Sequence, residues 1–356
     1  MIKMQTRQSI GTISVRTERA LRKRSKAVTW RSTMKSFIPC LLFANTLTQA
    51  WVSDKSVGSI TRSYKFALSA SRAASKNQNK QHWLQQRGLG AESTINSSMG
   101  RADIIGAGRI GSLLAEAGDC VLLGRGNKID PNGSGPILIA TRNDALDSIV
   151  DNCPENRKKD LVFLQNGYLD DFLTSKGLID NTQALLYFSV TAKGVEPVDG
   201  VTTVNPEGLT AVTGLHSKAF ADRLASLNLK CNVVTPEQYR PAMFEKLIWI
   251  STYMLVGTAK ECSSVGQAGS EHGDLIKQLI NELVVAVSNK EGIAFPEGTL
   301  ERLAAYTDVV ADFPCGVKEF EWRNQHFYRL GDEACPIHNG LLRECAENGK
   351  LSFQLT

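Results

Sequence analysis

The nine residues Asp103-Ile104-Ile105-Gly106-Ala107-Gly108-Arg109-Ile110-Gly111 join the end of a short apolar strand to the start of a helix through a glycine turn. Gly106 permits the tight turn, Gly108 allows a pyrophosphate to approach the backbone, and Gly111 allows the helix to pack closely on the strand. The unpaired N–H groups at the start of such a helix attract phosphate oxygens. The pattern therefore predicts a dinucleotide-binding turn at residues 106–111, to which Ala107, Arg109 and Ile110 also contribute.

Apolar runs around this turn predict a parallel α/β sheet. Strands are expected at 102–105, 120–123, 136–140, 160–164, 184–191, 201–204 and, at the sheet edge, 211–213. Helices are expected at 110–116 and 144–150. A continuous apolar run such as 136–140 is typical of a strand buried on both faces. Strands that alternate with helices at this spacing favour a parallel sheet.

The pattern changes to helical periodicity after Pro236. Helices are expected at 239–257, 273–292, 298–312 and 319–330, with almost no strand signal. Ile276, Leu279, Ile280 and Leu283 form one apolar stripe, which core packing explains. The predicted fold is therefore α/β: a compact Rossmann-type dinucleotide-binding domain at 101–235, followed by an all-helical substrate domain at 236–356.

The residues at the end of the second predicted strand distinguish NADP from NAD. Enzymes that use NAD usually place an acid there for the ribose hydroxyls, whereas an arginine can hold the 2′-phosphate of NADP. This chain has Leu123-Gly124-Arg125, followed by Lys128. Arg125 offers a bidentate guanidinium and Lys128 a second charge, so the sequence favours NADPH, although a solvated Arg125 is the alternative.

Four further segments follow in a characteristic order. They are Thr141-Arg142-Asn143, Leu164-Gln165-Asn166-Gly167, Phe244-Glu245-Lys246-Leu247 and Glu319-Phe320-Glu321-Trp322-Arg323-Asn324. Together with the glycine turn and Leu123-Gly124-Arg125, this ordered set resembles the ketopantoate reductase (2-dehydropantoate 2-reductase) family, within the wider 6-phosphogluconate-dehydrogenase-like group. The resemblance covers roughly residues 102–350.

The resemblance implies a role for each matching residue. Lys246 matches the catalytic lysine, the general acid that protonates the substrate carbonyl oxygen while NADPH delivers hydride to carbon. Asn166 matches the asparagine near the nicotinamide, and Glu319 the acid near the lysine and the substrate hydroxyl. Asn324 matches a substrate-site asparagine, and Arg142 stands where the family usually has a lysine in the cofactor cleft. A free lysine titrates near pH 10.4, so burial or a positive neighbour has to lower the pKa of Lys246.

The chain departs from the family pattern at two places. Ile250 and Met254 replace asparagines that hold substrate; Ser251 and Thr252 are candidates to replace part of that hydrogen bonding. Such losses can change substrate discrimination by orders of magnitude. In addition, the segment from Gly106 to Arg125 is short, and 125–136 leaves no room for a helix and a strand. The predicted sheet therefore lacks one crossover unit.

The first 100 residues differ in charge from the rest of the chain. They hold 17 Lys and Arg against three acids, whereas the remainder holds 24 against 33. The net charge of +5 therefore combines a basic leader with an acidic body, which argues against nucleic-acid binding. The leader has few large apolar residues and is expected to be disordered or cleaved.

Two targeting signals are expected within this leader. The apolar run 37–44 and Thr48-Gln49-Ala50 before Trp51 have the composition of a signal peptide and its cleavage site. A basic, acid-poor segment follows, as in the bipartite presequences of plastids acquired by secondary endosymbiosis. Plastid import is favoured over a mitochondrial presequence; a start at Met34 and a tail without an address are the other readings.

The cysteine and histidine spacings predict neither a disulfide framework nor a metal site. No C-x-x-C pair and no H-E-x-x-H motif occurs, and the five histidines are scattered. With Cys40 in the leader, seven cysteines remain in the body, which indicates reduced thiols in a stromal or matrix-like compartment.

Two functions remain open at this point. The favoured one is an NADPH-dependent reductase of a 2-keto acid or related carbonyl, with a small-molecule substrate and no membrane contact after leader removal. The alternative is a non-catalytic NADP-binding or redox-sensing protein of the same fold. Related chemistry on sugar or amino-acid derivatives is a more distant reading, and a homodimer is compatible with all three.

Overall fold

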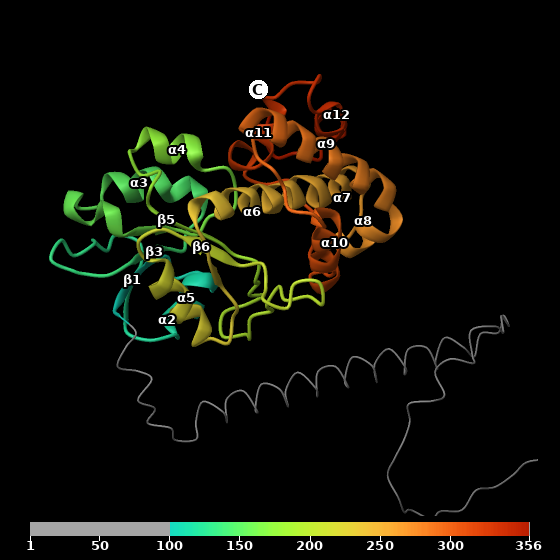
Figure 1. Ribbon diagram of the computed structural model, residues 1–356. Helices are drawn as coiled ribbons and strands as arrows, with labels where there is room; N and C mark the ends of the chain where they lie inside the picture. The colour runs from blue at the N-terminus through green and yellow to red at the C-terminus, as the bar shows by residue number, and fades with distance from the viewer. Residues whose placement is uncertain (1–99, 356) are drawn as a thin grey trace, which may run out of the picture. The chain divides into compact units, whose positions relative to one another are not determined.

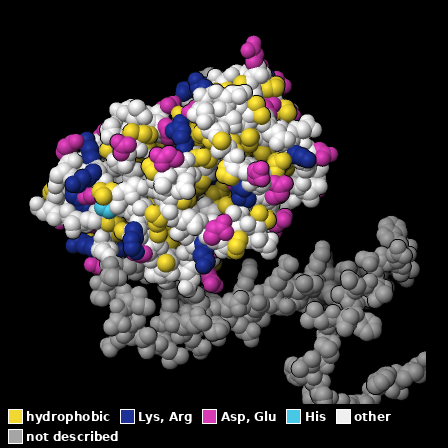
Figure 2. All heavy atoms as spheres, viewed as in Figure 1, with side chains coloured by type: hydrophobic (Ala, Val, Ile, Leu, Met, Phe, Trp, Pro, Cys, Tyr) yellow, Lys and Arg dark blue, Asp and Glu magenta, His cyan; other side chains and the backbone are white. Residues whose placement is uncertain are grey.

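The computed structural model describes residues 100–355 of the chain. The predicted leader, with the run 37–44 and the motif before Trp51, lies outside these residues. Within 100–355, no helix is both long enough and apolar enough to cross a membrane. On the face in Figure 2, basic and acidic side chains of the described part are interspersed.

A seven-stranded sheet forms the first half of the described chain (Figure 1). Its order is β2-β1-β3-β4-β5-β6-β7; β1 to β5 run parallel, β6 is antiparallel to β5, and β7 is parallel to β6. The strands are β1 (Ala102–Ile105), β2 (Cys120–Leu123), β3 (Ile137–Ile139), β4 (Leu161–Phe163), β5 (Thr182–Leu185), β6 (Ala211–Thr213) and β7 (Asn232–Val233). The predicted parallel α/β sheet is confirmed.

The predicted loss of one crossover unit is also confirmed. Residues 124–136, between β2 and β3, contain neither a helix nor a strand. In the classic order 3-2-1-4-5-6, a further strand lies outside the second one. Here β2 itself is the edge strand beside β1, and the chain passes directly to β3 on the other side of β1.

Short helices cover both faces of the sheet. Leu113 and Leu114 of α2 (Arg109–Ala115) pack with Phe220 and Leu224 of α5 (Ser217–Ala225) on one face. The opposite face carries α3 (Leu146–Asp151) and α4 (Asp170–Ser175). In β3, Leu138 joins the first cluster while Ile137 and Ile139 join the second. Both faces of β3 are therefore buried, which explains its continuous apolar sequence.

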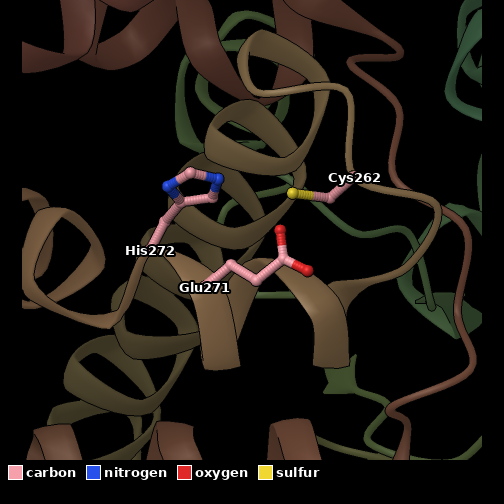
Figure 3. Close-up of side chains that lie close together, drawn as sticks. All are labelled: Cys262, Glu271 and His272. Atoms are coloured by element: carbon pink, nitrogen blue, oxygen red, sulfur yellow. The ribbon is translucent and has the colours of Figure 1, made fainter. Parts of the chain in front are cut away.

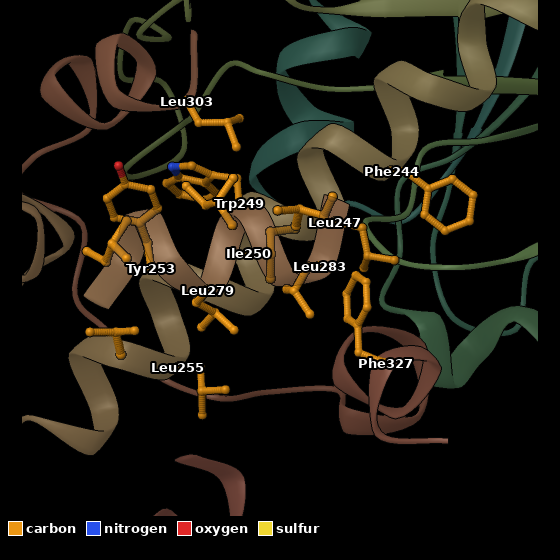
Figure 4. Close-up of a cluster of buried hydrophobic side chains, with 14 of the residues drawn as sticks. Phe244, Leu247, Trp249, Ile250, Tyr253, Leu255, Leu279, Leu283, Leu303 and Phe327 are labelled. Atoms are coloured by element: carbon orange, nitrogen blue, oxygen red, sulfur yellow. The ribbon is translucent and has the colours of Figure 1, made fainter. Parts of the chain in front are cut away.

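The second half of the chain is helical. Its elements are α6 (Pro236–Trp249), the π-helical turn η3 (Ile250–Met254), α7 (Leu255–Ala259), α8 (Val265–Glu271), α9 (Gly273–Glu291), α10 (Thr299–Val309), the 3₁₀ turn η4 (Phe320–Trp322), α11 (Asn324–Tyr328) and α12 (Pro336–Glu347). Thr235 and Gln238 form a capping box that starts α6. Leu247, Tyr253 and Leu283 belong to one apolar core between these helices (Figure 4).

Several predicted elements differ from the structure. Strand β5 begins at Thr182 and ends at Leu185, because the N–H of Tyr187 bonds to the Thr210 hydroxyl instead of continuing the ladder. Residues 201–204 form no strand, since Thr202 closes a local turn with Asn205. β6 is not the edge, because β7 pairs outside it. The predicted helix at 319–330 is two short turns, broken where Arg323 leaves helical geometry at φ −121° and ψ −75°.

Five short 3₁₀ or α segments and the last helix were not expected from the sequence. They are η1 (Asn143–Ala145), which precedes the predicted α3, η2 (Glu155–Asp160), α4, α5, α8 and α12. Most span only one or two turns, so the apolar stripe that would predict them is too short to stand out.

Candidate functional site

The glycine turn has the geometry that its sequence predicts. Gly106 has φ +104°, and a Cβ there would lie 2.7 Å from the Ala140 carbonyl oxygen. A Cβ on Gly111 would overlap the Gly106 carbonyl oxygen, so close packing of α2 on β1 requires glycine. A Cβ on Gly108 would meet no atom within 4 Å. The turn therefore leaves open space at Gly108, next to the start of α2.

A cavity of about 210 Å³ adjoins this turn. It lies at the carboxyl ends of the parallel strands, where ligands bind in open α/β sheets. Its wall comes from Ile110 of α2, from 139–143 after β3, from 164–166 after β4, and from Leu186 and Phe188 beyond β5. Glu319 and Arg323 close it from the helical half. The cavity thus joins segments that lie far apart in the sequence.

Hydrogen bonds fix the strand ends that line the cavity. Gln165 donates to the carbonyl oxygens of Ile139 (2.8 Å) and Thr141 (3.2 Å), linking β3 to β4. The Asn143 side chain donates to the Asn166 carbonyl oxygen at 3.1 Å, while its own Oδ1 is buried without a partner. Asn166 therefore lies in the cavity wall on a braced segment, and Asn143 offers an unused acceptor there.

Glu319 and Arg323 form an ion pair in the same wall. Glu319 adopts a left-handed conformation at φ +50°. One of its carboxylate oxygens accepts from the Asn143 N–H at 3.4 Å, and the other lies 2.5 Å from an Arg323 nitrogen. Burial lowers the pKa of Arg323, while the nearby Glu319 opposes that shift. The pair holds a carboxylate and a guanidinium at the edge of the cavity.

Lys246 lies directly behind this wall. It is only 5% exposed, and its ammonium donates to the carbonyl oxygen of Leu186, a residue that lines the cavity. Its Nζ lies 3.9 Å from the ring centre of Tyr187 and 5.3 Å from that of Tyr306. Burial, and secondly the positive charge of Arg323, lowers the pKa of Lys246 from 10.5 to about 7. Lys246 itself does not line the cavity.

Solved structures with this arrangement of sheet and helices are known. One, a ketopantoate reductase from Ralstonia eutropha JMP134, aligns with a TM-score of 0.52 and 17% identity over 70% of this chain and 99% of its own. A 2-dehydropantoate 2-reductase from Methylococcus capsulatus gives 0.52 and 15% identity over 72% and 99%. The chain has the fold of the ketopantoate reductases. A D-mandelate dehydrogenase solved with NADH and anilino(oxo)acetate aligns equally, with a TM-score of 0.52 and 14% identity over 70% and 98%.

Comparisons of the amino-acid sequence add no relatives to these structures. No protein-family model matches the chain, and no curated protein matches it. At 14–17% identity these likenesses establish the fold alone.

Among the remaining predicted site residues, Arg142 lines the cavity, whereas Arg125, Ser251 and Asn324 do not. Arg125 is exposed just beyond β2, and Arg142 lines the cavity with its side chain in solvent, 3.2 Å from Asp144. Asn324 is buried, and its Oδ1 lies 3.1 Å from His338 Nε2, so it does not line the cavity. Ser251 is buried in η3 with its hydroxyl unpartnered.

Asn143 and Arg323 were not singled out as site residues from the sequence. Asn143 follows the carboxyl end of β3, a position where polar residues meet ligands. This position in the sequence is enough to indicate Asn143 as a candidate site residue. Arg323 stands four residues after Glu319, a spacing that on its own indicates an exposed helix pair. Arg323 pairs with Glu319, and Glu319 in turn accepts from the N–H of Asn143, which lies 176 residues away in the sequence.

The Arg323 charge gives a testable pH dependence. If Lys246 donates a proton during carbonyl reduction, kcat/KM should fall as the pH rises through about 7, because the ammonium is then lost. Arg323→Leu removes a positive neighbour, so the pKa of Lys246 should rise and the falling limb should move to higher pH. The exposed Arg329→Leu is the control and should leave the limb in place. An unmoved limb in Arg323→Leu would refute the electrostatic coupling.

Proposed function

We propose that this protein is an NADPH-dependent reductase of a 2-keto acid or a related carbonyl compound, with Lys246 as the general acid. The observation that carries the proposal is the placement of Lys246. Burial beside the cavity brings its pKa to about 7, where an acid can donate a proton at neutral pH. The ketopantoate reductase fold and the glycine turn at the same cavity agree with this chemistry.

The proposed dinucleotide site extends from the glycine turn into the cavity. The open space at Gly108 suits a pyrophosphate, and Arg142 and Asn166 line the continuation of the site. When bound, NADPH supplies the hydride. The neighbouring D-mandelate dehydrogenase was solved with NADH, so the choice of NADPH depends on Arg125 at the end of β2.

The proposed proton transfer uses groups that the fold already places together. Lys246, in its ammonium form, donates to the developing alkoxide oxygen of the substrate as carbon accepts hydride. The Arg323 guanidinium favours loss of that proton and attracts an anionic substrate, while Glu319 keeps Arg323 in position. The D-mandelate dehydrogenase complex holds anilino(oxo)acetate, an α-oxo carboxylate, which supports a 2-oxo acid as the substrate class.

The two halves of the chain are proposed to contribute different parts of the site. Residues 101–235 are proposed to hold the cofactor and 236–356 to complete the substrate site with Lys246 and Glu319. Ser251 and Asn324 remain proposed substrate contacts, although both are buried here, so they require a rearrangement of η3 and α11 on binding. For the leader, the proposed role is import into a plastid, ahead of a mitochondrion.

A second candidate function is a non-catalytic NADP-binding or redox-sensing protein. One observation favours it: the Lys246 ammonium is bonded to the Leu186 carbonyl oxygen and enclosed by Tyr187 and Tyr306, outside the cavity lining. If the Lys246 side chain keeps these contacts and never reaches a substrate in the cavity, it stabilises the fold and takes no part in catalysis. Both candidates share the cofactor site and differ in whether a carbonyl compound is turned over.

A substrate screen separates the two candidates. The full-length protein is incubated with NADPH and a panel of 2-oxo acids and related carbonyls, and NADPH oxidation is followed by absorbance. Saturable oxidation with at least one 2-oxo acid is expected. NADPH binding without turnover across the panel would overturn the reductase and favour the sensor.

Arg125 provides a test of cofactor choice. Arg125→Ala should raise the Kd for NADPH about 10- to 100-fold, because hydrogen bonds to a charged group contribute roughly 1.5–3 kcal/mol. The Kd for NADH should change little, since NADH lacks the 2′-phosphate. Arg101→Ala, an exposed arginine at the opposite end of β1, serves as the control in fluorescence titrations. Equal losses for both cofactors would contradict a 2′-phosphate contact.

A further inference from the structure

Three side chains of different chemistry converge where α8 ends (Figure 3). Cys262 lies in the loop between α7 and α8, Glu271 is the last residue of α8, and His272 follows it. One ligand atom of each lies within 4.8 Å of the other two. Figure 3 shows the Cys262 sulfur pointing toward the carboxylate of Glu271 and the ring of His272.

We propose that Cys262, Glu271 and His272 bind a zinc ion. A thiolate, an imidazole and a carboxylate are all ligands of Zn²⁺, and a thiolate among them disfavours Mg²⁺ and Ca²⁺. Zinc bonds of about 2.0–2.3 Å place two tetrahedral ligands roughly 3.5 Å apart. Side-chain rotation of Glu271, which is exposed, and of partly exposed His272 can close the remaining distance. A fourth position stays open to water.

Hydrogen bonds of the Gln267 side chain already hold the loop and the helix end in place. The Gln267 side chain donates to one Glu271 carboxylate oxygen at 3.0 Å, which leaves the other oxygen available. The side-chain amide oxygen of Gln267 (Oε1) accepts from both the N–H and the hydroxyl of Ser263 at 2.8 Å. Ser263 is the neighbour of Cys262, so one side chain ties both parts of the proposed site together. Such outer-shell partners orient metal ligands.

The backbone around Cys262 is fixed as well. The Cys262 N–H bonds to the Gly257 carbonyl oxygen at 2.8 Å, and Ser264 caps α8 through the Gln267 N–H. The Cys262 thiol has only one weak contact, 3.9 Å to the Lys260 carbonyl oxygen, and the His272 ring has no hydrogen bond within residues 100–355. The thiol and the ring are therefore free to become ligands.

The sequence did not predict this site, because its spacing matches no zinc motif. Cys262 is separated from Glu271 and His272 by nearly the whole of α8, and the two halves meet only because the loop folds back along the helix. The site is independent of the proposed reductase, so its failure would leave the function of the cavity unaffected.

Cobalt provides a direct test on the reduced, full-length protein after removal of bound metal by chelation. Titration with Co²⁺ should give a thiolate-to-cobalt absorption band that saturates at one equivalent and is displaced by Zn²⁺. Cys262→Ser should abolish the band, and the surface change His272→Ala should weaken Co²⁺ binding at least 10-fold. Gln267→Ala should weaken it about 10- to 100-fold, the usual cost of losing an outer-shell partner.

Cys345→Ser is the matched control, because it removes a buried free thiol of α12 that is outside the proposed site. It should leave the band and its stoichiometry unchanged. A full band in Cys262→Ser, an unchanged Co²⁺ affinity in His272→Ala, or no thiolate band in the unaltered protein would each overturn the zinc site.

Discussion

Replacing Lys246 by methionine is expected to lower kcat for carbonyl reduction about 10²- to 10⁴-fold, the usual contribution of a general acid. Methionine is an unbranched side chain only one atom shorter than lysine, so it can still fill the space beside Tyr187 and Tyr306, but it has no proton to donate. The Kd for NADPH should stay within a few-fold of the original, because Lys246 does not line the cavity. Stopped-flow absorbance gives kcat, and fluorescence titration gives the Kd.

Thermal unfolding shows whether the methionine variant is folded. Burial lowers the pKa of Lys246, which means that the folded state disfavours its charged form. At neutral pH the unfolded chain therefore binds more protons than the folded one, so the buried lysine lowers the free energy of unfolding. This loss becomes smaller as the pH rises from about 7 toward 10.5. Lys246→Met should therefore unfold at the same or a higher Tm at pH 7. Unchanged kcat in this folded variant would rule out Lys246 as the acid.

Gly111→Ala is expected to destabilise the fold by on the order of 4 kcal/mol or more, because overpacking is one of the few causes of losses of that size. The new Cβ would overlap the Gly106 carbonyl oxygen, so α2 would have to move away from β1. The sheet face that α2 covers with Leu113 and Leu114 would open. Urea unfolding followed by circular dichroism measures the change.

Gly108→Ala, three residues earlier in the same turn, is the matched control. Its Cβ meets no atom within 4 Å, and its φ of −75° suits alanine, so this variant should fold with the original stability. Its NADPH affinity should nevertheless fall, because the methyl group occupies the space that the pyrophosphate needs. Equal stability of the two variants would refute the close packing at Gly111, and unimpaired NADPH binding by Gly108→Ala would refute the proposed phosphate position.

Local sequence patterns predicted the parts of the fold that depend on short-range chemistry. The strands β1 to β4 are short apolar runs at the predicted places, and α9 follows from one apolar stripe. The missing crossover unit followed from chain length alone, since 124–136 cannot hold a helix and a strand. β5 was misplaced because the apolar run continues past Leu185 into a buried segment whose backbone bonds to Thr210.

Long-range packing decided the parts of the site that the sequence did not indicate. Lys246 was expected to need a lowered pKa, but the positive neighbour, Arg323, is distant in sequence and looks like a solvated charge. Asn324 was expected at the substrate and is instead bonded to His338 of α12, a helix that was not predicted. A single sequence contains no record of these tertiary contacts.

Hydride transfer from NADPH to a carbonyl carbon in the cavity beside Lys246 can be measured by isotope transfer. NADPH deuterated at C4 of the nicotinamide is incubated with the full-length protein and each 2-oxo acid of the panel, and the products are analysed by mass spectrometry. A 2-hydroxy acid with one deuterium on its C2 is expected from the original protein, and Lys246→Met should form it about 10²- to 10⁴-fold more slowly. No labelled product with any 2-oxo acid, or equal rates of labelling by the two proteins, would contradict this mechanism.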